Sequence, residues 1–157
     1  VFVPADEMQK QREYIQLVRT LVESRFSASP KAFVHTYGCQ GNVSDGERIK
    51  GMLDAAGYDF TDNVEEADLI LYNTCAIREH AEDRIYGNVG AIKKLKKSNP
   101  NLKIALCGCM MQQQRVADKI KKSYPFVDLV FGVVCKIQRC AVGGRGRCND
   151  VGSSGRR

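Results

Sequence analysis

The sequence predicts a three-layer α/β domain built on a parallel sheet. Four apolar runs of strand type, 31–36, 68–72, 103–106 and 128–131, alternate with helical patterns. The run 68–72 is almost continuously apolar, which is typical of a strand buried on both faces. The composition, 43% hydrophobic and 27% charged over 157 residues, suits one globular domain.

The first helix is expected over residues 5–25. Its acidic start, Asp6 and Glu7, suits the positive end of a helix dipole. Apolar residues recur on one face, which should pack against the body of the domain: Tyr14, Leu17, Val18, Leu21 and Val22. Residues 27–30, Ser-Ala-Ser-Pro, break the pattern and form a connector to the first strand.

The second helix is expected to begin with a capping box, Ser44 with Glu47 three residues on. Its apolar stripe runs to Ala56, and Gly57 stands where a helix end favours positive φ. Residues 58–61 are predicted to form a short strand.

A long third helix should follow Cys75, with inward positions Ile77, Ala81, Ile85, Val89, Ile92 and Leu95. Gly87 and Gly90 interrupt this helix and predict close packing or a bend there. Pro100 ends it, and residues 112–124 form the next helix. The order βαβαβαβ predicts a flavodoxin- or Rossmann-like sheet with helices on both faces.

The net charge of +6 is unevenly distributed along the chain. Residues 1–132 hold 18 Lys/Arg against 17 Asp/Glu, whereas residues 133–157 hold 6 against 1. A nearly neutral domain argues against tight RNA binding through phosphate neutralisation. Residues 133–157 are glycine-rich and without apolar period, so we expect them to be disordered. No apolar run reaches the roughly 20 residues of a membrane span, and we expect a cytoplasmic protein without membrane contact.

Three of the seven cysteines, Cys39, Cys75 and Cys109, each follow a predicted strand. The loops after parallel strands meet at one sheet edge, where open α/β sheets bind ligands. Because neighbouring strands lie about 4.8 Å apart, three such thiols suit an iron–sulfur cube better than one small ion. Such clusters are usually held by four cysteines, so three ligands leave one iron open to a substrate, a sulfur donor or a small thiol.

Other interpretations of the cysteines stay open at this point. Each is also compatible with a small apolar core residue, above all Cys107, which lies nearer its strand but could stand in as a ligand. A zinc-binding structural domain is weakened by the absence of paired C-x-x-C knuckles. A cofactor-free, flavodoxin-like interaction module is the other alternative. His35 and His80 form no nucleophile pair that the sequence supports.

Three segments carry a resemblance to a known family: Tyr37-Gly38-Cys39-Gln40 with Asn42, Asn73-Thr74-Cys75-Ala76-Ile77-Arg78-Glu79, and Gly108-Cys109-Met110. They resemble the signature segments in the N-terminal domain of the MiaB-type methylthiotransferases, which are radical S-adenosylmethionine enzymes. The resemblance runs from about residue 31 to 132. Gln40 and the segment 76–79 resemble the branch that modifies tRNA.

The resemblance implies that Cys39, Cys75 and Cys109 hold an auxiliary [4Fe-4S] cluster whose open iron carries the sulfur to be transferred. It implies that the full-length enzyme converts N6-isopentenyladenosine at tRNA position 37 to its 2-methylthio derivative. S-adenosylmethionine and a second [4Fe-4S] cluster would belong to that full-length enzyme, and so would the contact with the tRNA anticodon stem-loop.

Polar residues of these segments have two interpretations. In the first, the cluster pocket is shaped by Asn42, Asn73, Thr74 and Arg78. In the second, the two asparagines and Thr74 form turns or helix caps, and Arg78 pairs with Glu82 one helical turn on.

The family's C-x-x-x-C-x-x-C motif is missing here, since Cys135, Cys140 and Cys148 have another spacing. We therefore expect three parts: a helix and connector over residues 1–28, the cluster domain over 29–132, and a non-native basic tail over 133–157. A chain cut before the radical domain should be inactive alone and bind tRNA weakly or not at all.

Overall fold

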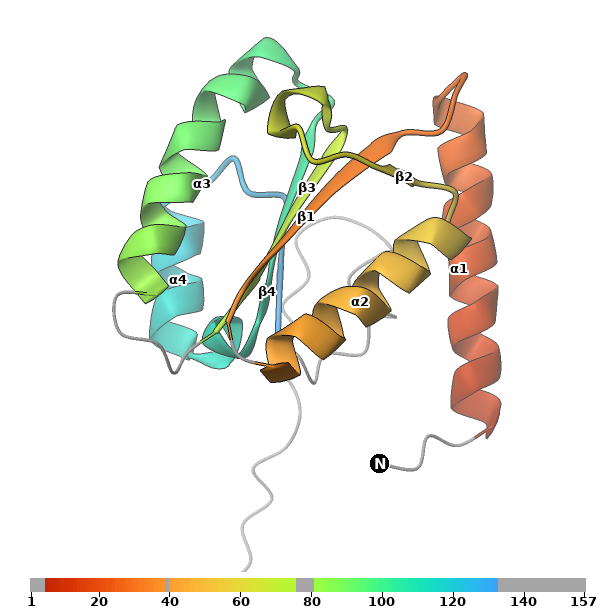
Figure 1. Ribbon diagram of the computed structural model, residues 1–157, viewed down its shortest axis with the longest axis horizontal. Helices are drawn as coiled ribbons and strands as arrows, with labels where there is room; N and C mark the ends of the chain where they lie inside the picture. The colour runs from red at the N-terminus through yellow and green to blue at the C-terminus, as the bar shows by residue number, and fades with distance from the viewer. Residues whose placement is uncertain (1–4, 39, 76–80, 133–157) are drawn as a thin grey trace, which may run out of the picture.

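The computed structural model describes residues 5–38, 40–75 and 81–132, and these form a sheet covered by helices (Figure 1). The strands are β1 (Lys31–Tyr37), β2 (Asp59–Phe60), β3 (Leu69–Thr74), β4 (Lys103–Gly108) and β5 (Leu129–Phe131). All pairings are parallel, in the order β2-β1-β3-β4-β5. This is the strand order of flavodoxin-like folds, so the predicted fold class is confirmed.

Helices cover both faces of the sheet. Figure 1 shows α1 (Ala5–Arg25) and α2 (Gln40–Ala55) on one side, and α3 (Ala81–Ser98) and α4 (Gln114–Ser123) on the other. Two short 3-10 turns, η1 (Val64–Glu66) and η2 (Cys109–Gln112), precede β3 and α4. Within the described ranges, none of the helices has the length and apolar character to cross a membrane.

The larger part of the core lies between the sheet and the helices α3 and α4. Ile70 and Tyr72 of β3 face this side with Ile104 and Leu106 of β4. They meet buried residues of the two helices: Ile85, Val89, Ile92, Val116 and Ile120. The α2 side is smaller and contains Leu71, Ala105, Cys107 and Phe131. Because alternate residues of β3 enter different clusters, its apolar run is buried on both faces, as predicted.

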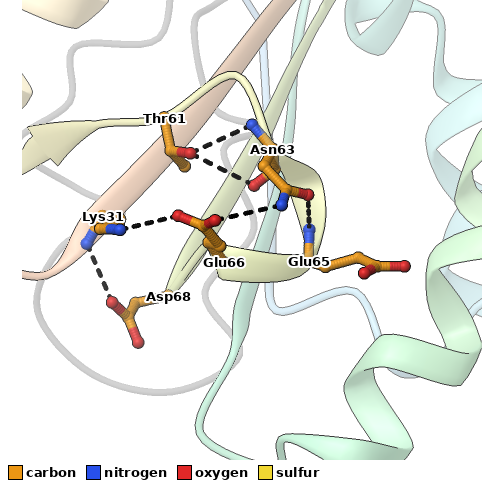
Figure 2. A network of polar contacts seen from close by, with 6 residues as sticks. All are labelled: Lys31, Thr61, Asn63, Glu65, Glu66 and Asp68. Carbon is orange, nitrogen blue, oxygen red and sulfur yellow. Dashed lines mark hydrogen bonds and ion pairs between the residues drawn. The ribbon is translucent and has the colours of Figure 1, made fainter.

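A polar network fixes the starts of β1 and β3 (Figure 2). The backbone N–H of Lys31 donates to Asp68 Oδ2 at 2.9 Å, and its Nζ lies 2.8 Å from Glu66 Oε2. Asn63 donates to Glu66 Oε1 at 3.2 Å and caps η1 by accepting from the N–H of Glu65 at 3.0 Å. An exposed ion pair contributes at most about 1 kcal/mol, so the network mainly sets the strand register.

The expected capping box of α2 is wrong, and so is close packing at Gly87 and Gly90 of α3, whereas the alternative of a bend there stays a prediction. The helix α2 begins at Gln40, so Ser44 is an exposed residue inside the helix and does not stand at its start. Gly87 and Gly90 lie on the solvent face of α3, where an added β-carbon would meet nothing within 4 Å. Close packing therefore does not explain these two glycines.

The N-terminal helix is covered less than its pattern predicts. Only Val22 is buried, while Leu17 and Leu21 are 48% and 47% exposed. The helix reaches the domain near Gly57, whose β-carbon position lies about 4.0 Å from Val22 Cγ1. Gly57 itself has φ +90°, which confirms its predicted role at the end of α2.

The remaining predictions either differ little from the structure or concern residues outside the described ranges. The short strand near residues 58–61 is confirmed as β2, and α4 starts at Gln114 because residues 109–112 form η2. The expected placement of Ile77 and the expected disorder of residues 133–157 lie outside the described residues.

Candidate functional site

Three adjacent strands end level with one another, and a cysteine follows each end. Tyr37 of β1 is paired in register with Thr74 of β3, and Thr74 with Gly108 of β4. Cys75 and Cys109 come directly after Thr74 and Gly108 in the sequence, and Cys39 comes two residues after Tyr37. The chain turns in opposite directions from β1 and β3, so this edge includes the switch point where doubly wound sheets bind ligands.

Cys75 and Cys109 are brought together by this register. Cys75 is only 1% exposed, whereas Cys109 is partly exposed. The Cys109 thiol donates to the carbonyl oxygen of Thr74, with 3.6 Å between the two heavy atoms. That carbonyl belongs to the peptide bond leading into Cys75. Both residues are thiols rather than disulfide partners, and Cys39 lies outside the described residues.

Cys107 has a different environment, although it is only two residues from Cys109. It is 1% exposed in the core cluster on the α2 side of the sheet. Burial, together with the nearby charge of Asp45, raises the pKa of its thiol to about 12. A thiol with this pKa stays protonated at neutral pH, so the structure supports the prediction of a core residue.

Buried polar side chains join the strand ends behind the cysteines. Asn42 and Asn73 are 4% and 1% exposed, and Asn73 Nδ2 donates to the backbone oxygen of Asn42 at 2.7 Å. Asn42 Nδ2 donates to the Thr74 carbonyl at 3.1 Å. The Thr74 hydroxyl donates to the carbonyl of Cys107 at 2.7 Å, which links β3 to β4. Asn42, Asn73 and Thr74 stand out in the sequence, but their contacts with one another could not be predicted from it.

Glycine is required at two positions beside the cysteines. Gly108 has φ +109°, and a β-carbon there would lie 2.1 Å from the Thr74 carbonyl oxygen. A β-carbon on Gly38 would lie 2.5 Å from Asn42 Oδ1. Real β-carbons essentially never approach so closely, so each glycine lets one cysteine-bearing segment press against its neighbour.

One contact joins α3 to the end of β1, and another joins α4 to α3. Asn88 donates to the Tyr37 hydroxyl at 2.8 Å. Arg115 donates to Glu82 through its two terminal guanidinium nitrogens, from Nη2 to Oε1 at 2.5 Å and from Nη1 to Oε2 at 3.4 Å. The predicted alternative partner of Glu82 is Arg78, which lies outside the described residues. The Arg115 partner was missed because the two residues are 33 positions apart and no local pattern joins them.

The histidines offer no second centre within the described residues. His35 is exposed, its ring lying 4.4 Å from that of Tyr37 and 6.1 Å from that of Phe33, centroid to centroid. His80 lies outside the described residues.

The two cysteines of the site that the structure describes, Cys75 and Cys109, are suitable ligands for a sulfur-ligated metal group. Across residues 5–38, 40–75 and 81–132, no three His, Cys, Asp or Glu side chains gather as a metal site. These ranges include two of the three predicted ligands, since Cys39 lies outside them. The two that are covered are thiols from neighbouring strand ends, and soft sulfur donors are those that iron–sulfur clusters use.

One family description matches most of the chain. The description "Uncharacterized protein family UPF0004" covers residues 31–132, from the first residue of β1 to Gly132. The chain belongs to this family. The UPF0004 region contains Cys39, Cys75 and Cys109 and leaves α1 outside.

Similar proteins carry the name tRNA-2-methylthio-N(6)-dimethylallyladenosine synthase. The protein of this name from Clostridioides difficile (strain 630) is 47% identical over 135 residues, which is 84% of this chain and 28% of the relative. The one from Caldicellulosiruptor saccharolyticus is 60% identical over 97 residues, 62% of this chain and 21% of the relative. The chain thus spans about a quarter of the length of these relatives. The resemblance to the N-terminal domain of MiaB-type enzymes is confirmed.

Proposed function

We propose that this UPF0004 domain binds an auxiliary [4Fe-4S] cluster through Cys39, Cys75 and Cys109 and serves a tRNA methylthiotransferase. The observation that carries the proposal is the level register of Tyr37, Thr74 and Gly108 across three adjacent strands. Adjacent strands lie about 4.8 Å apart, so ligands after their ends span the width of a cube of four irons.

The surroundings of the cysteines support an anionic, sulfur-ligated group. Cys39 stands in the sequence directly before Gln40, the first residue of α2, and the unpaired N–H groups at a helix start favour negative charge. Cys75 is almost fully buried, which keeps water from this ligand. Cys107 stays a protonated core thiol and is not a ligand in this proposal.

Three ligands define what the group would supply. When bound, the cluster would offer one iron without a cysteine ligand, at which a sulfur donor can bind and sulfur can be presented for transfer. The protein would supply three thiolate ligands. Burial of Cys75 limits water there, and the side of Cys109 stays accessible because Cys109 is partly exposed.

The relatives' name supports a proposal for the activity of a longer protein that contains this domain. We propose that such a protein methylthiolates an isopentenylated adenosine of cytoplasmic tRNA, using S-adenosylmethionine and a second cluster bound by residues that this chain lacks. The 157 residues contain no C-x-x-x-C-x-x-C motif, and we expect them to be inactive by themselves. The near-neutral charge over residues 1–132 makes the chain a weak tRNA binder alone.

Anaerobic reconstitution with iron and sulfide tests the cluster proposal. The parent chain should take up about four irons and gain visible absorption, and Cys39→Ala, Cys75→Ala and Cys109→Ala should each lose most of the iron. Cys107→Ala is the matched control, because it removes a neighbouring thiol from the core and should leave iron uptake unchanged.

Two results would contradict the proposal. Iron uptake that none of the three substitutions changes would favour a cofactor-free interaction module. One zinc per chain, in a colourless protein, would favour a zinc-binding structural domain.

A further inference from the structure

Asn42 of α2 and Asn73 of β3 form a reciprocal buried pair although they are 31 residues apart. Asn73 Nδ2 donates to the backbone oxygen of Asn42 at 2.7 Å, and Asn42 Nδ2 lies 3.4 Å from Asn73 Oδ1. Polar side chains this deeply buried are stable only when they are hydrogen-bonded, so each asparagine fixes the orientation of the other. The pair cross-links the start of α2 to the end of β3.

The pair touches the segment of the first cysteine through Gly38. A β-carbon on Gly38 would lie 2.5 Å from Asn42 Oδ1, so the Asn42 side chain packs directly on this backbone. Gly38 is the residue before Cys39. A shift of the Asn42 side chain would therefore change the space available to Gly38, the residue before Cys39.

The same pair touches the segments of the other two cysteines. Asn42 Nδ2 donates to the Thr74 carbonyl, which leads into Cys75 and also accepts the Cys109 thiol. A β-carbon on Gly108, the residue before Cys109, would lie 2.8 Å from Asn73 Oδ1. One pair of amide side chains thus contacts the residue that precedes each of the three cysteines.

We infer that the Asn42–Asn73 pair positions the three cysteine-bearing segments for the cluster, an inference that rests on the proposed function. The pair fixes Gly38, Thr74 and Gly108 relative to one another before any bond to a metal forms. Residues that orient metal ligands in this way typically change metal affinity or activity by about 10- to 100-fold when they are replaced.

The test compares iron retention in reconstituted chains. Asn42→Asp keeps the side chain's shape but replaces the amide donor to the Thr74 carbonyl by an oxygen, and Asn42→Ala removes the side chain. Asn73→Asp removes the donor to the Asn42 carbonyl. Circular dichroism shows whether each variant folds. If Asn42→Ala does not fold, the isosteric Asp variants still test the inference.

Two control variants separate positioning from stability. Ile92→Val loosens the core on α3, where Ile92 is 3% exposed, without touching the site. Asn101→Ala removes an exposed amide just before β4, at the sheet edge opposite to the cysteines. The measured quantities are the rate of iron release to an excess of ferrous chelator and the electron paramagnetic resonance spectrum after reduction.

The expected result is iron release about 10- to 100-fold faster in the Asn42 and Asn73 variants, with an altered resonance spectrum, and parental behaviour in both controls. Release within twofold of the parent in the folded asparagine variants, or equal acceleration in Ile92→Val, would overturn the inference while the proposed function stands. A parent chain that takes up no iron would instead overturn the proposed function.

Discussion

Replacing Gly108 by alanine tests how closely the ends of β3 and β4 press together. Gly108 has φ +109° and ψ 177°, a backbone region that is essentially restricted to glycine. The added β-carbon would also lie 2.1 Å from the Thr74 carbonyl oxygen and 2.6 Å from its nitrogen. These are backbone atoms, so the strands must separate to make room.

The size of the effect follows from two contributions. Backbone strain of this kind costs about 1–3 kcal/mol, and forcing an extra carbon into a packed site costs about 1–3 kcal/mol more. Gly108→Ala should therefore lower the free energy of unfolding by roughly 2–6 kcal/mol. With a urea dependence of about 2 kcal/mol per molar, the unfolding midpoint falls by roughly 1–3 M.

Urea unfolding followed by circular dichroism measures this change. Gly90→Ala is the matched control, because its β-carbon meets open space on the exposed face of α3 and should stabilise the helix by about 0.5–1 kcal/mol. If Gly108→Ala leaves the midpoint at the parental value, or raises it as Gly90→Ala should, the close contact between the two cysteine-bearing strand ends is refuted.

Three further predictions concern packing and ionisation. Gly46→Ala should lower the free energy of unfolding by about 1–3 kcal/mol, because its β-carbon would lie 2.5 Å from Thr36 Oγ1. Adding Thr36→Ala to this variant should recover part of the loss in urea titrations. If the free-energy changes of the two substitutions simply add, the contact between the two positions is contradicted. Cys107 should resist iodoacetamide at pH 8 until urea unfolds the chain, since its pKa is raised to about 12; peptide mass spectrometry checks this, and labelling of the folded chain would disprove it. Burial, with the neighbouring Tyr37, raises the pKa of Tyr72 to about 12, so stability is full below about pH 10 and falls as the pH rises towards 12; urea midpoints across this range should decline less in Tyr72→Phe, and an identical decline would contradict the assignment.

The order of strands and helices could be predicted because the spacing of apolar residues along the chain reflects which side chains are buried. Residues 68–72 and 103–106 are apolar since both faces of β3 and β4 are covered. The start of α2 was predicted wrongly because the pattern Ser44 with Glu47 is a local signal that also occurs inside helices, and α2 begins four residues earlier, at Gln40. Helical period in α1 likewise indicates an apolar face but not what covers it, and Leu17 is exposed.

The site was predictable in outline and not in detail. Topology alone places the residues after β1, β3 and β4 at one edge, so Cys75 and Cys109 could be expected to meet. The contacts of Asn42 with Thr74, and of Arg115 with Glu82, depend on register and helix rotation to within one residue. A single sequence carries no periodic signal for such pairs.

The most direct test of the central claim uses a chain that retains only the three proposed ligands. In this variant, serine replaces Cys107, Cys135, Cys140 and Cys148, and the chain is reconstituted anaerobically with ⁵⁷Fe and sulfide. The account predicts about four irons per chain and a Mössbauer spectrum of one [4Fe-4S] cluster, both lost when Cys39, Cys75 or Cys109 is also replaced. A variant that takes up no iron, while the parent chain does, would contradict the three-cysteine site.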